Sequence, residues 1–529
     1  MNDISPRASA DGMAPVIFGD CLGWLHPAPP GGTAVLLCAG VSDDFCNGYR
    51  PFRLLAQHLA AAGYPVLRFD YPGMGDSADA HLPNLWQAWQ KSLTTAADFL
   101  LARTGAERLI LIGLRIGGTL AAMAAAQRGD VAGLVLIEPC FTGRSYVSQL
   151  VTAARLRGAQ PQDGSIEVGE LVFTPTCLEQ MRATELAQLA LPAALPVAIF
   201  SRMAEEKISA RLASWKTQIS CHGLGGLDAM LRPSHHGGEP ELDAAPLLGW
   251  LRGAIPPSPR SAPAVPARAM PVALTLPGCT EMPLRFGAAL HLVGIVCRPV
   301  RESFPGLAVL ICNAGGNPRH GFARFGVECA RALARAGIAS LRFDFAGLGD
   351  SIHESGGEDL QTDVFTEDRL SDIRDSLDAL EVLGYRRFAL HGLCSGAYHA
   401  VHGARADSRI SQLLTVNLPW FSLRHERPGP DSIAQNCLNT LLSRDTAALF
   451  LFGDNDAGLK SFERHFGEGG HLLPAASAIQ LRVIPNLDHE LTAGWMRQAV
   501  AAQIVNFIQR QQAGSDSAIA EGEHQHDHA

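Results

Sequence analysis

The 529-residue sequence is poor in charged residues and has no long apolar run. Charged residues make up only 18% and the formal net charge is -9, so the clustered Lys and Arg surface that nucleic acids need is not expected. No apolar stretch reaches the roughly 18–20 residues of a membrane-spanning helix. Residues 1–15 also lack the apolar segment of an export signal. We therefore expect neither nucleic-acid binding nor a membrane span.

Paired cysteine spacing is missing as well. The twelve cysteines are scattered, and without an export signal we expect most of them to be reduced core residues of a cytoplasmic protein. The apolar fraction of 47% is typical of a globular protein with large cores. We expect no cofactor and no metal site. The polar segment 514–529 is interpreted as a disordered tail, and the alternative is adventitious metal binding by its three histidines.

A repeat divides the chain into two similar halves. Residues 68–77 read RFDYPGMGDS and residues 342–351 read RFDFAGLGDS, with seven of ten positions identical. A second match pairs LILIGLRIGG at 109–118 with FALHGLCSGA at 388–397. Between the halves lies PPSPRSAPAVPAR, a Pro-, Ala- and Ser-rich stretch with little to bury. The order of matched segments predicts a duplicated domain rather than a solenoid.

We therefore divide the chain into residues 1–255, a linker at 256–269, a second domain at 270–513 and a tail at 514–529. Within each half, short apolar strands alternate with helices. This alternation predicts α/β domains, each with a mainly parallel sheet covered by helices on both faces. A longer segment after Cys140 predicts a small helical cap.

The pentapeptide GLCSG at 392–396 follows an apolar strand and opens a helix. Such a tight turn pushes its central side chain outward, and the N–H groups behind it stabilise an anion. We expect Cys394 to be the attacking residue, since a thiolate is a strong nucleophile. The alternatives are an inert buried cysteine, or attack by Ser395. The glycine frame favours Cys394 and leaves Ser395 to supply its N–H to an oxyanion hole.

Two further groups follow in the order that a catalytic triad needs. An apolar strand leads to GDND, where Asp456 is the preferred acid and Asp454 the alternative. A later strand leads to His489, the expected general base. The Gly-rich loop near Ala314 and Gly315 is expected to provide the second oxyanion donor.

These motifs resemble the α/β-hydrolase superfamily, from about residue 284 to 511 and more loosely from 16 to 253. The resemblance rests on RFDFAGLGDS, GLCSG, GDND and the His489 loop. It implies two tandem α/β-hydrolase domains and cleavage of an ester, thioester or lactone. The cysteine at the bend is similar to that of dienelactone hydrolases and some thioesterases, and both bends resemble hydrolases encoded near exosortase systems.

The first half lacks a nucleophile at the equivalent position, where Arg115 stands. Arginine stays protonated and cannot attack a carbonyl. We expect a non-catalytic domain in which His235 and His236 serve no nucleophile. Arg115 either pairs with a nearby carboxylate or binds an anionic group of the substrate. In the second half, Trp420 and Phe421 either line an acyl pocket or pack in the core.

The sequence thus predicts a hydrolase that works through an acyl-cysteine intermediate on a Cys394–His489–Asp456 triad. One alternative is an acyltransferase that uses the same acyl-cysteine, and another is a non-catalytic scaffold. The expected partner is a small-molecule acyl substrate, free or carried by coenzyme A or an acyl carrier protein. A homodimer is left open.

Overall fold

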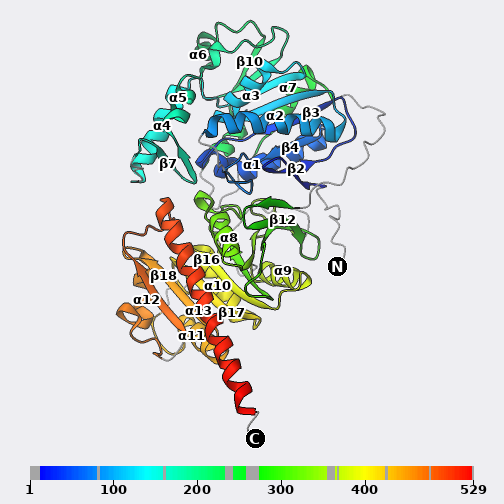
Figure 1. The fold of residues 1–529 in the computed structure, drawn as a ribbon. Helices are drawn as coiled ribbons and strands as arrows, with labels where there is room; N and C mark the ends of the chain where they lie inside the picture. Colours follow the sequence, from blue (N-terminus) through cyan, green and yellow to red (C-terminus); the bar gives the residue numbers. More distant parts are fainter. Residues whose placement is uncertain are drawn as a thin grey trace. The chain divides into compact units, whose positions relative to one another are not determined.

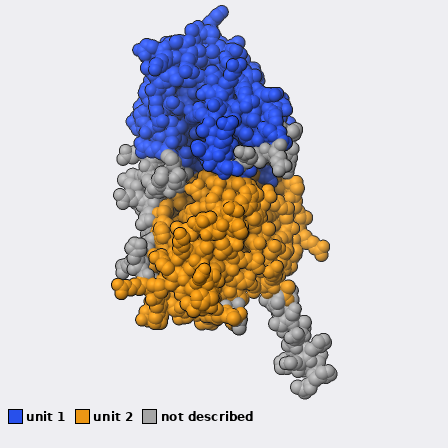
Figure 2. Space-filling view, turned by 90° about the vertical axis from the view of Figure 1, so that its left-hand side faces the viewer, with its two compact units in different colours: residues 1–274 blue, residues 275–529 orange. Residues whose placement is uncertain are grey.

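The computed structural model describes residues 12–79, 84–158, 163–232, 242–257, 273–353, 364–365, 369–422, 427–475 and 478–526, with side chains to residue 513. It divides the chain into two compact units, unit 1 at residues 1–274 and unit 2 at residues 275–529 (Figure 2). Most of the expected linker and both His235 and His236 lie outside the described residues. Each unit is described by itself below.

Unit 1 is built on a sheet of eight strands among its described residues. The strands beyond the first two run parallel, whereas the β1–β2 and β2–β4 pairs are antiparallel. In their order across the sheet the strands are β1 (Ala14–Phe18), β2 (Cys21–His26), β4 (Val66–Phe69), β3 (Thr33–Cys38), β5 (Arg108–Leu114), β6 (Val131–Ile137), β9 (Val197–Phe200) and β10 (Ile219–His222).

Helices cover both faces of this sheet (Figure 1). One apolar core lies under α1 (Asp43–Ala61) and α7 (Ala245–Ala254), and another under α2 (Leu85–Thr104) and α3 (Ile116–Gln127). The central strands are buried on both sides, which explains their continuous apolar runs. The insertion between β6 and β9, where a helical cap was expected, also holds a hairpin. Its elements are α4 (Gly143–Leu156), β7 (Ile166–Val168), β8 (Leu171–Phe173) and α5 (Pro175–Arg182).

Unit 2 repeats this sheet order with one additional edge strand. From β15 to β19 in the sheet order the strands run parallel to one another, whereas the β12–β13 and β13–β15 pairs are antiparallel. Across the sheet they are β11 (Leu274–Leu276), β12 (Cys279–Phe286), β13 (Leu292–Pro299), β15 (Ala339–Asp344), β14 (Leu307–Cys312), β16 (Arg387–Leu393), β17 (Ile410–Val416), β18 (Ala447–Gly453) and β19 (Ile479–Ile484).

One face of the second sheet packs against α8 (Phe325–Arg335) and α13 (Gly494–His526). The other face packs against α9 (Arg369–Val382), α10 (Ser395–Ala406), α11 (Ile433–Ser443) and α12 (Ala457–Phe466). Helix α13 ends at His526, so it includes part of residues 514–529, which were expected to be a disordered tail. The expected fold class is confirmed in both units: a mostly parallel sheet between two layers of helices.

The ends of the parallel strands create the site, because their carboxyl ends meet at one edge of the sheet. In unit 2 this edge carries the residues that follow β14, β16, β17, β18 and β19. None of the helices in the described part of the chain is sufficiently long and apolar to span a bilayer.

Candidate active site

A strained bend at Cys394 joins β16 to α10. Its φ of 54° and ψ of -122° are unusual for a residue with a side chain. Two glycines permit the bend, because a Cβ on Gly392 would lie 2.1 Å from the Gly396 carbonyl and one on Gly396 would lie 2.8 Å from the Cys312 oxygen. The GLCSG pattern is therefore explained by close backbone approach, with the Cys394 side chain only partly buried.

His489 and Asp456 meet at this edge of the sheet. The His489 Nδ1 lies 2.6 Å from Asp456 Oδ2, and the other carboxylate oxygen accepts the Gly458 N–H at 2.7 Å, at the start of α12. Asp454, the alternative acid, is turned elsewhere: its Oδ1 accepts the Asn486 N–H at 2.9 Å. Of the two acids, the structure brings Asp456 to the imidazole.

The environment of His489 favours its charged form. Its hydrogen bond to Asp456, followed by its hydrogen bond to Cys394, raises the pKa of His489 to about 10, against the opposing effect of burial. The imidazole therefore holds a proton at neutral pH. The contact with Cys394 also shows that the bend and the His489 loop face one another.

The loop around Ala314 and Gly315, which is expected to supply an oxyanion donor, lies against the bend. One of its backbone N–H groups is already hydrogen-bonded there. The Gly315 N–H donates to Ser395 Oγ at 2.7 Å, which favours the Ala314 N–H of the two donors expected from this loop. The hydroxyl of Ser395 satisfies that N–H before any substrate arrives. The backbone N–H groups of Ala314 and Ser395 remain as the proposed donors.

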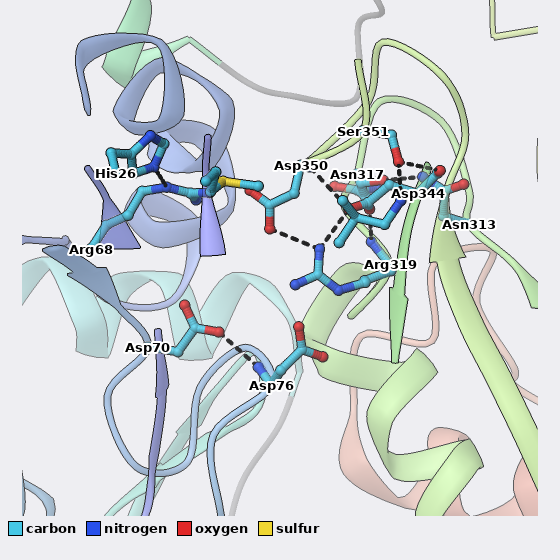
Figure 3. Close-up of polar contacts among 12 residues, drawn as sticks. His26, Arg68, Asp70, Asp76, Asn313, Asn317, Arg319, Asp344, Asp350 and Ser351 are labelled. Carbon is cyan, nitrogen blue, oxygen red and sulfur yellow. Dashed lines mark hydrogen bonds and ion pairs between the residues drawn. The ribbon is translucent and has the colours of Figure 1, made fainter. Parts of the chain in front are cut away.

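A buried ion cluster, which the sequence analysis missed, anchors this loop (Figure 3). Arg319 Nη1 lies 2.6 Å from Asp344 Oδ2 and 2.9 Å from Asp350 Oδ2, with all three side chains fully buried. Burial raises the pKa of Asp344 to about 6, although Arg319 acts in the opposite direction. The signal was present in the repeated motif, because Asp344 and Asp350 are its two aspartates, but the arginine partner lies outside it.

Trp420 and Phe421, the two aromatic residues considered for an acyl pocket, differ in burial. Phe421 is 3% exposed and packs against Phe450 and Phe462, which favours core packing, one of the two roles expected for it. Trp420 is 40% exposed and lies 5.2 Å from the Phe365 ring. Only Trp420 keeps a surface that a substrate can reach.

The bend of unit 1 has the same backbone shape with a different side chain. Arg115 has φ 53° and ψ -120°, and α3 begins at the next residue. Its Nε lies 3.4 Å from Asp44 Oδ2 and its Nη2 donates to Gln149 Oε1 at 2.6 Å. These contacts favour the carboxylate-pairing role of Arg115 over the binding of a substrate anion. Among the described residues, no group of three or more His, Cys, Asp or Glu side chains is arranged to hold a metal ion.

Comparison with known families finds a match to part of unit 1. Residues 33–188, all in unit 1, match the family model described as "Serine aminopeptidase, S33". A search of curated proteins finds no match. The matched segment and the fold support an enzyme of the α/β-hydrolase type.

A search of solved structures returns matches of low identity. A dienelactone hydrolase from Anabaena variabilis is 16% identical, with 44% of this chain and 98% of that chain covered and a TM-score of 0.34. An alpha-beta serine hydrolase homologue from Coxiella burnetii is 17% identical, with 44% and 94% covered and a TM-score of 0.30. A putative hydrolase from Agrobacterium vitis is 22% identical, with 41% and 92% covered and a TM-score of 0.31. Scores this low carry no argument about activity.

The family match corrects the expected mechanism. The matching family is one of serine enzymes, which points to a serine nucleophile and contradicts the hydrolase with an acyl-cysteine intermediate. The acyltransferase alternative falls with it, because it relies on the same intermediate. The scaffold alternative is at odds with the support for an enzyme.

Proposed function

We propose that unit 2 carries a hydrolytic site that cleaves a carbonyl-centred bond of a small-molecule acyl compound, with His489 and Asp456 as the proton-transfer pair. The observation that carries this proposal is the 2.6 Å hydrogen bond between His489 Nδ1 and Asp456 Oδ2 at the carboxyl edge of the sheet. Asp456 is buried and the imidazole is 44% exposed. The pair therefore presents a charge-stabilised imidazole to solvent and substrate.

The chemistry follows from the state of the imidazole. Because the pKa of His489 is raised to about 10, the ring carries a proton at neutral pH that it can donate to a leaving group. In this proposal a water oxygen adds to the carbonyl carbon, the leaving group takes the imidazolium proton as its bond to that carbon breaks, and the proton lost by the water returns to the imidazole. Asp456 fixes the ring orientation and stabilises its charge. The N–H groups of Ala314 and Ser395 face the developing oxyanion in this proposal. One such donor typically contributes about 3–4 kcal/mol to lowering the barrier.

We further propose that the two units arose by duplication and that the chain works in the cytoplasm. The shared strand order and the shared bend geometry of Arg115 and Cys394 support the duplication. The twelve cysteines are free thiols, which fits a reducing compartment. Unit 1 is, in this proposal, the non-catalytic copy.

The test is hydrolysis of p-nitrophenyl esters of graded acyl length by the full chain. His489→Gln and Asp456→Asn should each lower kcat/KM by about 10²- to 10⁴-fold, as expected on losing a general acid–base group or its partner. His471→Gln is the matched control, because His471 is an exposed histidine of the same unit whose ring contacts the Glu468 carbonyl. Parent activity in His489→Gln would overturn the proposal.

A second experiment addresses the attacking group. Cys394→Ser places at the bend the hydroxyl that the matching family uses, beside the same imidazole. We expect this variant to hydrolyse the esters with the same dependence on His489. Intact-protein mass spectrometry after substrate addition checks the correction independently: a stable acyl adduct mapped to Cys394 in the parent would reinstate the acyl-cysteine mechanism.

A further inference from the structure

Asn417 occupies the first position after β17, between the strands that lead to the bend and to the acid. It is fully buried and adopts a φ of 47°. Its N–H donates to the Leu451 carbonyl of β18 at 2.9 Å. Asparagine tolerates this left-handed backbone better than most residues with a side chain.

The side-chain amide of Asn417 connects two loops. One is the histidine loop, which follows β19 and contains His489, and the other is the acid loop, which follows β18 and contains Asp456. Its Nδ2 donates to the carbonyls of Asp488 and His489, at 3.0 and 3.1 Å. Its Oδ1 accepts the Gly453 N–H at 3.0 Å. One amide thus uses its donors on the histidine loop and its acceptor on the last residue of β18.

Both loops end at the proton-transfer pair. Gly453 is linked to Asp456 by a 3.1 Å hydrogen bond from the Asp456 N–H to the Gly453 carbonyl, and the other loop contains His489 itself. The imidazole is 44% exposed, so packing does little to fix its place. The backbone anchor at Asn417 and the bond to Asp456 supply that constraint instead.

We propose that Asn417 is a positioning residue that holds the histidine loop and the acid loop of the site at the separation their hydrogen bond requires. This inference rests on the proposed function of unit 2. It adds a residue that acts through the pair without contacting the substrate. Displacement of a catalytic group by about 1 Å costs on the order of 10²-fold in rate.

Unit 1 provides a natural comparison. Glu138 follows β6 with a φ of 43°, and its N–H donates to the Phe200 carbonyl at 2.7 Å, the same arrangement as Asn417. Its carboxylate accepts hydrogen bonds from Ser201 Oγ and Arg202 N, at 3.1 and 2.9 Å. A carboxylate anchors the next loop in this way but has no N–H to donate to carbonyls of a histidine loop. The donor amide occurs in the unit that holds the His–Asp pair.

The test uses two substitutions in the full chain. Asn417→Gly keeps the left-handed backbone and removes the amide, while Asn417→Asp keeps the size and the acceptor and removes both N–H donors. We expect each to lower kcat by roughly 10- to 100-fold, with KM within about twofold of the parent. The pKa of His489, followed by NMR, should fall from about 10 as its bond to Asp456 loosens.

Asp454→Ala is the matched control. It removes the exposed bridge from Asp454 Oδ1 to the Asn486 N–H, which joins the same two loops, and should change kcat by less than about twofold because an exposed link adds little. Parent kcat together with an unchanged His489 titration in both Asn417 variants would overturn the inference. Parent activity in His489→Gln would instead overturn the proposed function, and the His489 titration would still decide the role of Asn417.

Discussion

The two units share a strand order and a bend but differ in what the bend presents. Arg115 and Cys394 agree within 2° in ψ and 1° in φ, since the angles are -120° and -122°, and 53° and 54°. Both bends need glycine because the backbone packs closely around them. A Cβ on Gly117 would lie 2.1 Å from the Ala39 oxygen, and one on Gly396 would lie 2.8 Å from the Cys312 oxygen. The bend is thus maintained by backbone packing, independently of the chemistry of its central residue.

The buried arginines of the repeated motif give a second contrast. Arg342 Nη1 lies 2.9 Å from Glu281 Oε1, and Arg331 binds the other oxygen of the same fully buried carboxylate at 2.7 Å. In unit 1 the equivalent Arg68 donates to His26 Nε2 at 3.0 Å (Figure 3). Unit 2 therefore places more charge in its interior.

The largest expected effect tests this difference in buried charge. Glu281→Gln removes the carboxylate that two buried guanidinium groups share, and should destabilise unit 2 by about 3–5 kcal/mol. His26→Gln keeps an acceptor for Arg68 and should cost unit 1 about 1 kcal/mol. Urea denaturation followed by hydrogen-exchange mass spectrometry reports each unit separately. Equal losses in the two variants would remove the contrast.

The next effect concerns the proton on His489, which has no counterpart among the described residues of the unit 1 site. NMR titration of the parent should show a pKa of about 10, and Asp456→Asn should move it back toward the ordinary value of about 6.5. Because the folded pKa is the higher one, the associated stability is fully present below about pH 6.5 and is lost as the pH rises through about 10. An unchanged pKa in Asp456→Asn would contradict the pairing.

The smallest effects are expected at the bend of unit 1. Arg115→Ala breaks a partly exposed pair with Asp44 and should cost no more than about 1 kcal/mol, with ester hydrolysis unchanged. Arg115→Cys combined with His489→Gln should restore no activity, because a thiol at that bend has no described imidazole–carboxylate pair beside it. Recovered activity in the double variant would show that unit 1 still holds a functional site.

Much of this comparison was accessible from the sequence, for identifiable reasons. The repeated motif and the alternation of strands with helices predicted both sheets, because short continuous apolar runs are typical of strands that are buried on both faces. The spacing of GDND favoured Asp456 over Asp454, and the structure brings Asp456 to His489. The glycine frame likewise located the bend at Cys394.

Other features depend on contacts that no local pattern encodes. The Gly315 N–H is satisfied by Ser395 Oγ from another segment, and Phe421 turns into a cluster of distant rings. The hydrogen bonds of the Asn417 side chain reach residues that lie 36 and 71 positions away in the sequence. The attacking group was also misjudged, because a thiol at the bend suggested cysteine chemistry whereas the matching family points to serine.

The strained bend has a consequence for how such chains diversify. A non-glycine residue with positive φ costs on the order of 1 kcal/mol or more, and unit 1 keeps that cost with an arginine that cannot attack. Its scaffold has therefore not relaxed to an unstrained connection. Exchanging a few side chains, with no rebuilding of the main chain, is the shortest evolutionary or engineering route to a second reactive centre there.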